Sequence, residues 1–160
     1  MKLSELFDEV LVIDDNDRDN ADKLGVFTKI AESSQTFQNY HEKYRESILE
    51  ILLERERLGA TAINDCVCFP HARIEGLKVS IFILVVLRNG VDWKVNDGER
   101  CFFMVLGLVP VSCCEEHLER LAYLTGFFSQ TEIVQTIIYR ADREKILEYI
   151  RDYERNSGFS

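Results

Sequence analysis

The two most apolar runs constrain the fold of this chain more than any other feature. They cover residues 79–87 and 101–109 and are rich in β-branched and aromatic side chains. A strand that is apolar at every position is typical of the interior of a sheet covered on both faces. Each run has about half of the roughly 20 residues that a membrane-spanning helix needs. We therefore expect two buried strands and no membrane insertion.

Helical patterns precede these runs. A short β-type segment is expected at residues 10–13, after which Asp19 or Asn20 can cap a helix. The inner face of that helix is expected to hold Leu24, Phe27, Ile30 and Ala31. Apolar residues at three- and four-residue steps predict a second helix between Asn39 and Gly59.

Helical patterns also follow the runs. Capping-box patterns beginning at Ser112 and Ser129 indicate two helix starts, and Asp142 can cap a final helix. Turns are expected at residues 89–90 and 96–98. The order of elements predicts a single α/β domain over residues 1–160, with a mixed β-sheet flanked by helices on both faces.

Composition narrows the class of partner and the compartment. The formal net charge of −9 argues against nucleic acid as a partner, because a phosphate backbone recruits Lys and Arg. The N-terminus lacks the apolar core of a signal peptide, and five cysteines, an odd number, do not suggest a disulfide framework. We expect a cytoplasmic protein with free thiols.

Residues 69–73, Phe-Pro-His-Ala-Arg, carry the clearest chemical signal. Pro70 lacks an N–H and favours an extended Phe69, so we expect the strand to end here and to deliver His71 at its terminus. A neutral imidazole in that position is a nucleophile near pH 7. A histidine in a loop can equally have no function, and the surrounding segments distinguish the two cases.

Those segments resemble, in order and spacing, the type-2 IIA family of the bacterial sugar phosphotransferase system. They are Leu-Glu-Arg-Glu at 53–56, Thr61, residues 69–73, and Glu-His-Leu-Glu-Arg-Leu-Ala at 116–122 after Pro110. Val-Asp-Trp at 91–93 and the Asp-Gly turn at 97–98 also match. The family includes fructose and mannitol transport components and the nitrogen-regulatory IIA protein.

The resemblance implies a phosphotransferase with a phosphohistidine intermediate and no cofactor. His71 is the implied phosphoryl acceptor, Arg55 the active-site arginine and His117 a second histidine that faces the first. Phosphoryl transfer spreads negative charge over oxygens, which a permanently cationic Arg55 can stabilise. Thr61 is expected as a hydroxyl donor, and Glu56 is expected to hold Arg55 in place. Read alone, Arg55 and His117 are also compatible with ordinary exposed helix positions.

The resemblance also implies protein partners. An HPr-like phosphocarrier protein would donate the phosphoryl group, and a downstream regulatory protein or a permease IIB domain would follow. A stand-alone IIA chain is more similar to the nitrogen-regulatory branch, so we predict a regulatory carrier. A IIA subunit of a fructose- or mannitol-type sugar permease is the alternative within the family.

A glycine-rich approach to Pro-His is usual in the family and is absent here, since residues 62–68 read Ala-Ile-Asn-Asp-Cys-Val-Cys. Two cysteines thus lie near His71, and two more, Cys113 and Cys114, lie near His117. A non-catalytic module that senses thiol oxidation or binds metal is therefore a further alternative. Neighbouring cysteines are awkward joint ligands and a strand cysteine packs as a small hydrophobe, so we predict no metal site.

Overall fold

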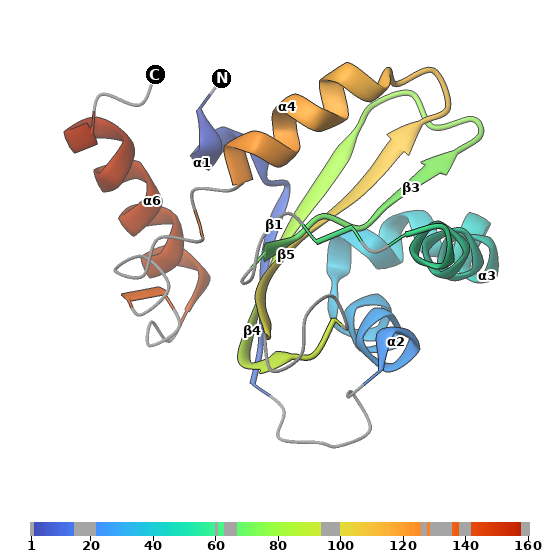
Figure 1. Ribbon diagram of the computed structural model, residues 1–160, viewed down its shortest axis with the longest axis horizontal. Coiled ribbons are helices and arrows are strands. Elements are labelled where there is room, and N and C mark those ends of the chain that lie inside the picture. The colour runs from blue at the N-terminus through green and yellow to red at the C-terminus, as the bar shows by residue number, and fades with distance from the viewer. Residues whose placement is uncertain are drawn as a thin grey trace.

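A computed structural model describes residues 2–14, 22–59, 61–62, 67–93, 100–125, 128, 136–137 and 142–157, without the side chains of 41–47 and 123–124. Its centre is a mixed sheet with the strand order β1-β4-β5-β2, in which β3 also pairs with β5 (Figure 1). These strands are β1 (Glu9–Ile13), β2 (Val67–Cys68), β3 (His71–Ile74), β4 (Ile81–Val91) and β5 (Cys101–Pro110).

The two apolar runs form the centre of this sheet. β4 and β5 pair antiparallel, whereas β1 joins β4 and both β2 and β3 join β5 in parallel. Almost every side chain from Ile81 to Leu87 and from Phe103 to Val109 is buried. The predicted pair of interior strands is therefore confirmed.

Helices cover both faces of the sheet, as predicted. α2 (Lys23–Ser33) and α3 (Gln35–Arg57) lie on one face, and α1 (Leu3–Leu6), α4 (Glu115–Thr125) and α6 (Arg143–Ser157) lie on the other (Figure 1). The mixed α/β architecture is that of the predicted fold class. None of the helices in the described ranges is both long and apolar enough to cross a membrane.

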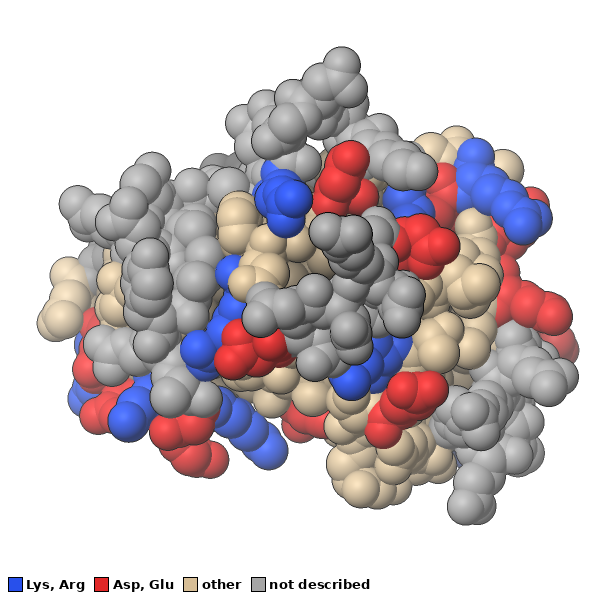
Figure 2. Space-filling model, turned by 90° about the horizontal axis from the view of Figure 1, so that it is seen from below, with Lys and Arg blue, Asp and Glu red and all other residues tan. Residues whose placement is uncertain are grey.

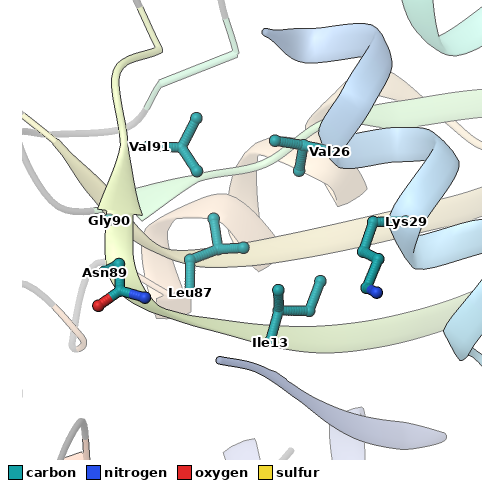
Figure 3. A pocket seen from close by; sticks show the side chains of 7 residues that line it. All are labelled: Ile13, Val26, Lys29, Leu87, Asn89, Gly90 and Val91. Carbon is teal, nitrogen blue, oxygen red and sulfur yellow. The ribbon is translucent and has the colours of Figure 1, made fainter. Parts of the chain in front are cut away.

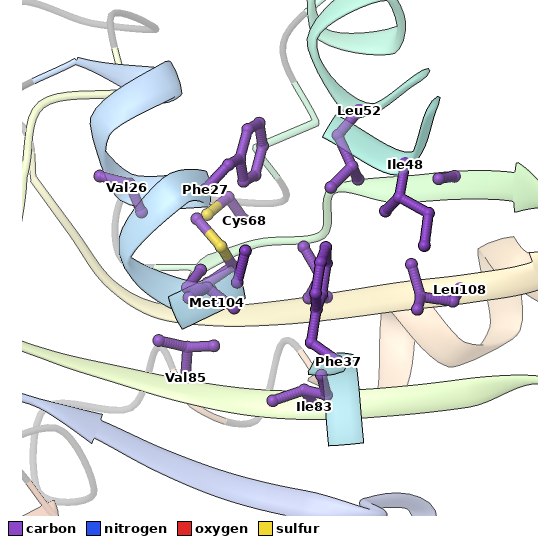
Figure 4. Packing of buried hydrophobic residues seen from close by; sticks show 14 of the residues in the cluster. Val26, Phe27, Phe37, Ile48, Leu52, Cys68, Ile83, Val85, Met104 and Leu108 are labelled. Carbon is purple, nitrogen blue, oxygen red and sulfur yellow. The ribbon is translucent and has the colours of Figure 1, made fainter. Parts of the chain in front are cut away.

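Alternation along the central strands divides the core between the two faces. Ile83 and Val85 of β4 pack with α2 and α3, together with Phe27, Phe37 and Leu52 (Figure 4). The intervening Leu84 and Val86 pack on the opposite face with side chains of α4 and α6. Because side chains alternate along a strand, one apolar run supplies both cores.

Helix boundaries differ from the predicted ones. The side chain of Asp22, rather than Asp19 or Asn20, caps α2 by accepting from the N–H of Gly25 (2.7 Å). Leu24 is half exposed and does not belong to the inner face of α2. α3 begins at Gln35, before Asn39, and its cap is Ser34.

The later helices show one more difference. α4 begins at Glu115, after the capping position predicted at Ser112. Asp142 caps α6 as predicted, since its side chain accepts from the N–H of Lys145 (2.9 Å). The helix predicted at Ser129 and the turn at 96–98 lie outside the described residues.

Residues 89–90 are not the predicted turn between strands. β4 continues through them to Val91, with an irregularity in its pairing with β5 between Val86 and Val91. Gly90 has φ 66°, and a Cβ at this position would lie 2.9 Å from the ring of Phe102. The Asn-Gly pair therefore lies at an irregularity within a long strand. Gly90 adopts a positive φ there, a backbone conformation that glycine tolerates at low cost.

Candidate active site

His71 opens β3 directly after a break in the edge of the sheet. The N–H of Phe69 donates to the backbone oxygen of Thr61 (2.8 Å) rather than to β5, and Pro70 has no N–H to donate. The strand is interrupted here and resumes at His71, whereas we predicted that it would end. The predicted position of His71 at a strand terminus is confirmed.

The imidazole of His71 is held by a backbone carbonyl. Its Nδ1 atom lies 3.1 Å from the oxygen of Phe69, two residues earlier. A carbonyl oxygen only accepts, so Nδ1 carries the proton and Nε2 keeps its free electron pair. Burial lowers the pKa of His71, the bond to Phe69 raises it, and the positive charge of Arg55 lowers it again. The net direction is downward, which keeps the ring neutral near pH 7.

A pocket of about 210 Å³ opens beside His71. It brings His71 together with Arg55 and Thr61, two residues that the sequence singled out. The remaining lining residues are Ala62, Phe69, Glu115, Leu118, Glu119 and Ala122. Pockets for larger organic ligands usually have about 300 to 1,000 Å³, so this volume suits a group of phosphoryl size.

Arg55 lies in the last turn of α3 and is half buried. Its Nη1 donates to the backbone oxygen of Gly59 (2.9 Å), which is its only hydrogen bond to a described residue. A guanidinium has five N–H donors, and only one of them is bonded to a described residue. Arg55 therefore brings a fixed charge and further N–H donors beside His71.

Glu56 does not pair with Arg55, which corrects the predicted arrangement. Its buried carboxylate accepts from Lys23 Nζ (2.9 Å), from Trp93 Nε1 (3.1 Å), and from the hydroxyl and the N–H of Thr61. The hydroxyl proton of Thr61 is therefore committed to Glu56, although Thr61 also lines the pocket. Residue spacing does not indicate Lys23 and Trp93 as partners of Glu56, because both are distant along the chain.

α4 forms the opposite wall of the pocket. Its residues Glu115, Leu118, Glu119 and Ala122 lie at three- and four-residue steps and share one face. His117 lies in the first turn of α4, as predicted, and is half buried. It is not among the described residues that line the pocket.

Arg73 ties the start of α4 to the sheet. Its guanidinium donates to the backbone oxygens of Val111 (3.5 Å) and Cys113 and pairs with the carboxylate of Glu115 (2.8 Å). The tether orients the helix that faces His71. The charge of Arg73 also contributes to lowering the pKa of His71, and that of Glu115 opposes it.

Gly107 lies opposite His71 on β5 and was not singled out from the sequence. Its N–H donates to the oxygen of Pro70 (2.9 Å). A Cβ at this position would lie 3.1 Å from Cε1 of Phe82 and 3.4 Å from Cβ of His71. A glycine inside an apolar strand is a signal for such close approach.

The sequence model of one family, described as "Phosphoenolpyruvate-dependent sugar phosphotransferase system, EIIA 2", matches residues 5–153. The chain belongs to this family. The resemblance inferred from the segments around His71 is thus confirmed over nearly the whole length.

Similar proteins fall in two branches of the IIA family. A nitrogen regulatory protein of Pseudomonas aeruginosa is 27% identical over 109 residues, which is 68% of this chain and 71% of that protein. One from Bradyrhizobium diazoefficiens is 29% identical over 98 residues, 61% of this chain and 63% of that one. The 2-O-alpha-mannosyl-D-glycerate-specific EIIABC component of Escherichia coli is 27% identical over 67% of this chain and 17% of its own.

Solved structures support the same fold. The nitrogen regulatory protein IIA-Ntr of Neisseria meningitidis has a TM-score of 0.70 at 24% identity and covers 92% of this chain and 97% of its own. The mannitol IIA protein of Escherichia coli has a TM-score of 0.61 at 14% identity, with coverages of 88% and 94%. The sheet and helices described above are therefore those of IIA domains.

The cysteines of this IIA chain are free thiols where the structure describes them. Sγ of Cys68 lies 2.8 Å from Sγ of Cys101, and burial raises the pKa of the Cys68 thiol well above its ordinary value. A thiol held in its protonated form is a poor metal ligand and a poor nucleophile. The described residues contain no group of three or more His, Cys, Asp or Glu side chains that could hold a metal, and Cys66 lies outside them.

A second, smaller pocket lies at the far end of β4. Its volume is about 30 Å³, and its lining is mainly apolar, from Ile13, Val26, Leu87 and Val91 with Lys29 and Asn89 at its edge (Figure 3). That space holds about one or two water molecules. On the face in Figure 2, basic and acidic side chains are interspersed among uncharged ones. Neither this small pocket nor the mixed-charge surface is as good a candidate for a functional site as the pocket at His71.

Proposed function

We propose that this IIA chain is a phosphoryl carrier that accepts a phosphoryl group on Nε2 of His71 from a histidine-phosphorylated carrier protein of the HPr type. The observation that carries the proposal is the hydrogen bond from Nδ1 of His71 to the oxygen of Phe69, beside a pocket that also contains Arg55. The bond leaves Nε2 as the nucleophile, and burial keeps the ring neutral.

The transfer can be written for these residues. The electron pair on Nε2 of His71 attacks phosphorus, and the bond between phosphorus and the donor's imidazole nitrogen breaks, so the electron pair leaves with the donor ring. The proton on Nδ1 stays in place. Because the imidazole gains positive character as the N–P bond forms, its hydrogen bond to the Phe69 carbonyl strengthens. The spare donors of Arg55 stabilise the charge on the equatorial oxygens.

The pocket supports a protein donor rather than a nucleotide. Its volume suits a single phosphoryl group, and its wall on α4 is partly apolar, with Leu118 and Ala122. An apolar rim lets a docked carrier exclude water without a long-lived complex, since a carrier must release its partner in each cycle. His117 remains the second histidine that the family resemblance implies, in the first turn of α4 and outside the lining of the pocket.

For the downstream role we propose regulation, with a phosphorylation-dependent protein partner. Support comes from the nitrogen regulatory relatives, which match over about two thirds of this chain. The alternative is passage of the phosphoryl group to a permease IIB domain. The mannitol IIA protein of Escherichia coli has been solved in complex with a phosphorylated IIB, and its fold matches this one with a TM-score of 0.62.

The deciding experiment is phosphoryl transfer from phosphoenolpyruvate through enzyme I and HPr, read by intact mass. We expect one acid-labile phosphoryl group on the wild type and none on His71→Ala. Retention of the group on His71→Ala would assign it to another residue and overturn the proposal. Adding a fructose- or mannitol-type IIB domain separates the two downstream roles, because only the permease role predicts rapid passage to it.

A further inference from the structure

The carboxylate of Glu56 is buried just behind the pocket and does not line it. Only 2% of its side chain is exposed, and it accepts from the ammonium of Lys23, the indole N–H of Trp93, and both donors of Thr61. These partners come from α2, from the segment after β4 and from the segment before β2. A buried charge with this many donors is held in one place, because every alternative position leaves it unsatisfied.

Thr61 connects this carboxylate to the site of phosphorylation. Its backbone oxygen accepts from the N–H of Phe69 (2.8 Å), and the oxygen of Phe69 accepts from Nδ1 of His71 (3.1 Å). The hydrogen-bonded path therefore runs from Glu56 through Thr61 and Phe69 to the imidazole. This path supports Phe69, which lies between the paired residues of β2 and β3 and orients His71.

We propose that Glu56 and Thr61 are positioning residues for His71. Glu56 fixes Thr61, Thr61 fixes the Phe69 peptide, and the Phe69 carbonyl fixes the tautomer and direction of the imidazole. The proposal rests on the proposed function of His71 as phosphoryl acceptor. It differs from a purely structural role, in which the network would stabilise the fold but leave the imidazole unaffected.

The chain offers a matched control for this network. On the other face of the sheet, where α1 and α6 lie, Ser4 donates both its hydroxyl (2.7 Å) and its N–H (3.1 Å) to Glu154, another buried carboxylate. Ser4→Ala and Thr61→Val each remove one hydroxyl from such a pair. Thr61→Ser keeps the hydroxyl and serves as the rescue variant.

The test has two readouts on folded protein. One is the rate of phosphoryl acceptance from phospho-HPr at varied donor concentration, and the other is the tautomer of His71 from its ¹⁵N shifts. We expect Thr61→Val to lower the maximal rate by about tenfold or more, with little change in the half-saturating donor concentration, because misplaced reacting groups lose much of their proximity advantage. It should also lower the Nδ1–H population. Ser4→Ala should change neither, and Thr61→Ser, which keeps the hydroxyl, should restore most of the rate and of the Nδ1–H population that Thr61→Val loses.

The outcomes separate this proposal from the one on which it rests. An unchanged rate and tautomer in Thr61→Val would overturn the positioning role while leaving phosphorylation of His71 intact. A wild type that accepts no phosphoryl group would overturn the proposed function, and the tautomer measurement would still decide the positioning role. If Thr61→Val does not fold, Trp93→Phe removes one donor to Glu56, keeps an aromatic side chain, and should shift both readouts in the same direction.

Discussion

The Nδ1 atom of His71 and the backbone oxygen of Phe69 are 3.1 Å apart, and this contact decides which nitrogen of the imidazole can react. Phe69 turns its N–H away from β5 and donates it to the backbone oxygen of Thr61. In an extended residue the N–H and the C=O point to the same side, so the Phe69 carbonyl also faces away from β5 and is available to the imidazole. The side of this segment that faces away from β5 is thus a direct part of the site's chemistry.

The first prediction concerns pH. Since burial sets the pKa of His71 below its ordinary value of 6.5, phosphoryl acceptance should fall as pH is lowered, with a midpoint below 6.5. An NMR titration of His71 should give the same midpoint as the rate. A midpoint at or above 6.5 would contradict the burial argument.

The same shift affects folding stability. The unfolded chain binds a proton on His71 at higher pH than the folded chain does. The stability associated with the neutral ring is therefore fully present above about pH 6.5 and is lost as pH falls through the lowered folded pKa. Urea unfolding of the wild type and His71→Gln across this range should show a pH-dependent difference, and parallel curves would contradict the prediction.

Replacement of Arg55 should affect both rate and pKa. Arg55→Ala removes the cationic donor and should slow phosphoryl acceptance by about 100-fold, in the range found when one charge-stabilising donor is lost. It should also raise the pKa of His71, because the charge of Arg55 lowers it. Arg57, in the same turn of α3, is exposed and pairs only with Glu54 among the described residues, so Arg57→Ala is the matched control. Equal effects of the two variants would show that Arg55 has no specific role in the site.

His117→Ala tests whether His117 contributes to phosphoryl transfer although it does not line the pocket. His117 lies in the first turn of α4 but does not line the pocket, whereas Arg55 does. We expect a smaller loss of rate than with Arg55→Ala, measured in the same transfer assay. A loss as large as that of Arg55→Ala would mean that the side chain moves to the phosphoryl group when the donor docks.

Gly107→Ala tests the close packing behind His71. The added methyl group would meet the ring of Phe82 at 3.1 Å and Cβ of His71 at 3.4 Å. We expect a loss of about 1 to 3 kcal/mol in the free energy of unfolding, as overpacked cores show, together with slower phosphoryl acceptance. Thermal or urea unfolding measures the first effect, and an unchanged stability would show that Phe82 moves aside without strain.

Much of this site was accessible from local sequence. Pro70 before His71, and the position of Arg55 near the end of a helix, follow from residue types and spacing within short segments. The missed features have a different origin. Gly107 offered a local signal as a glycine inside an apolar strand, whereas the interruption that returns to a strand at His71 depends on pairing with β5.

The sequence by itself determined the sheet with two covered faces, because strands that are apolar at every position have no other stable environment in water. It also determined that an imidazole would follow a break in a strand. Only the tertiary structure decided that Glu56 meets Lys23, Trp93 and Thr61 rather than Arg55. Periodicity shows which side of an element is buried, but the partner across a contact is set by how distant elements pack together.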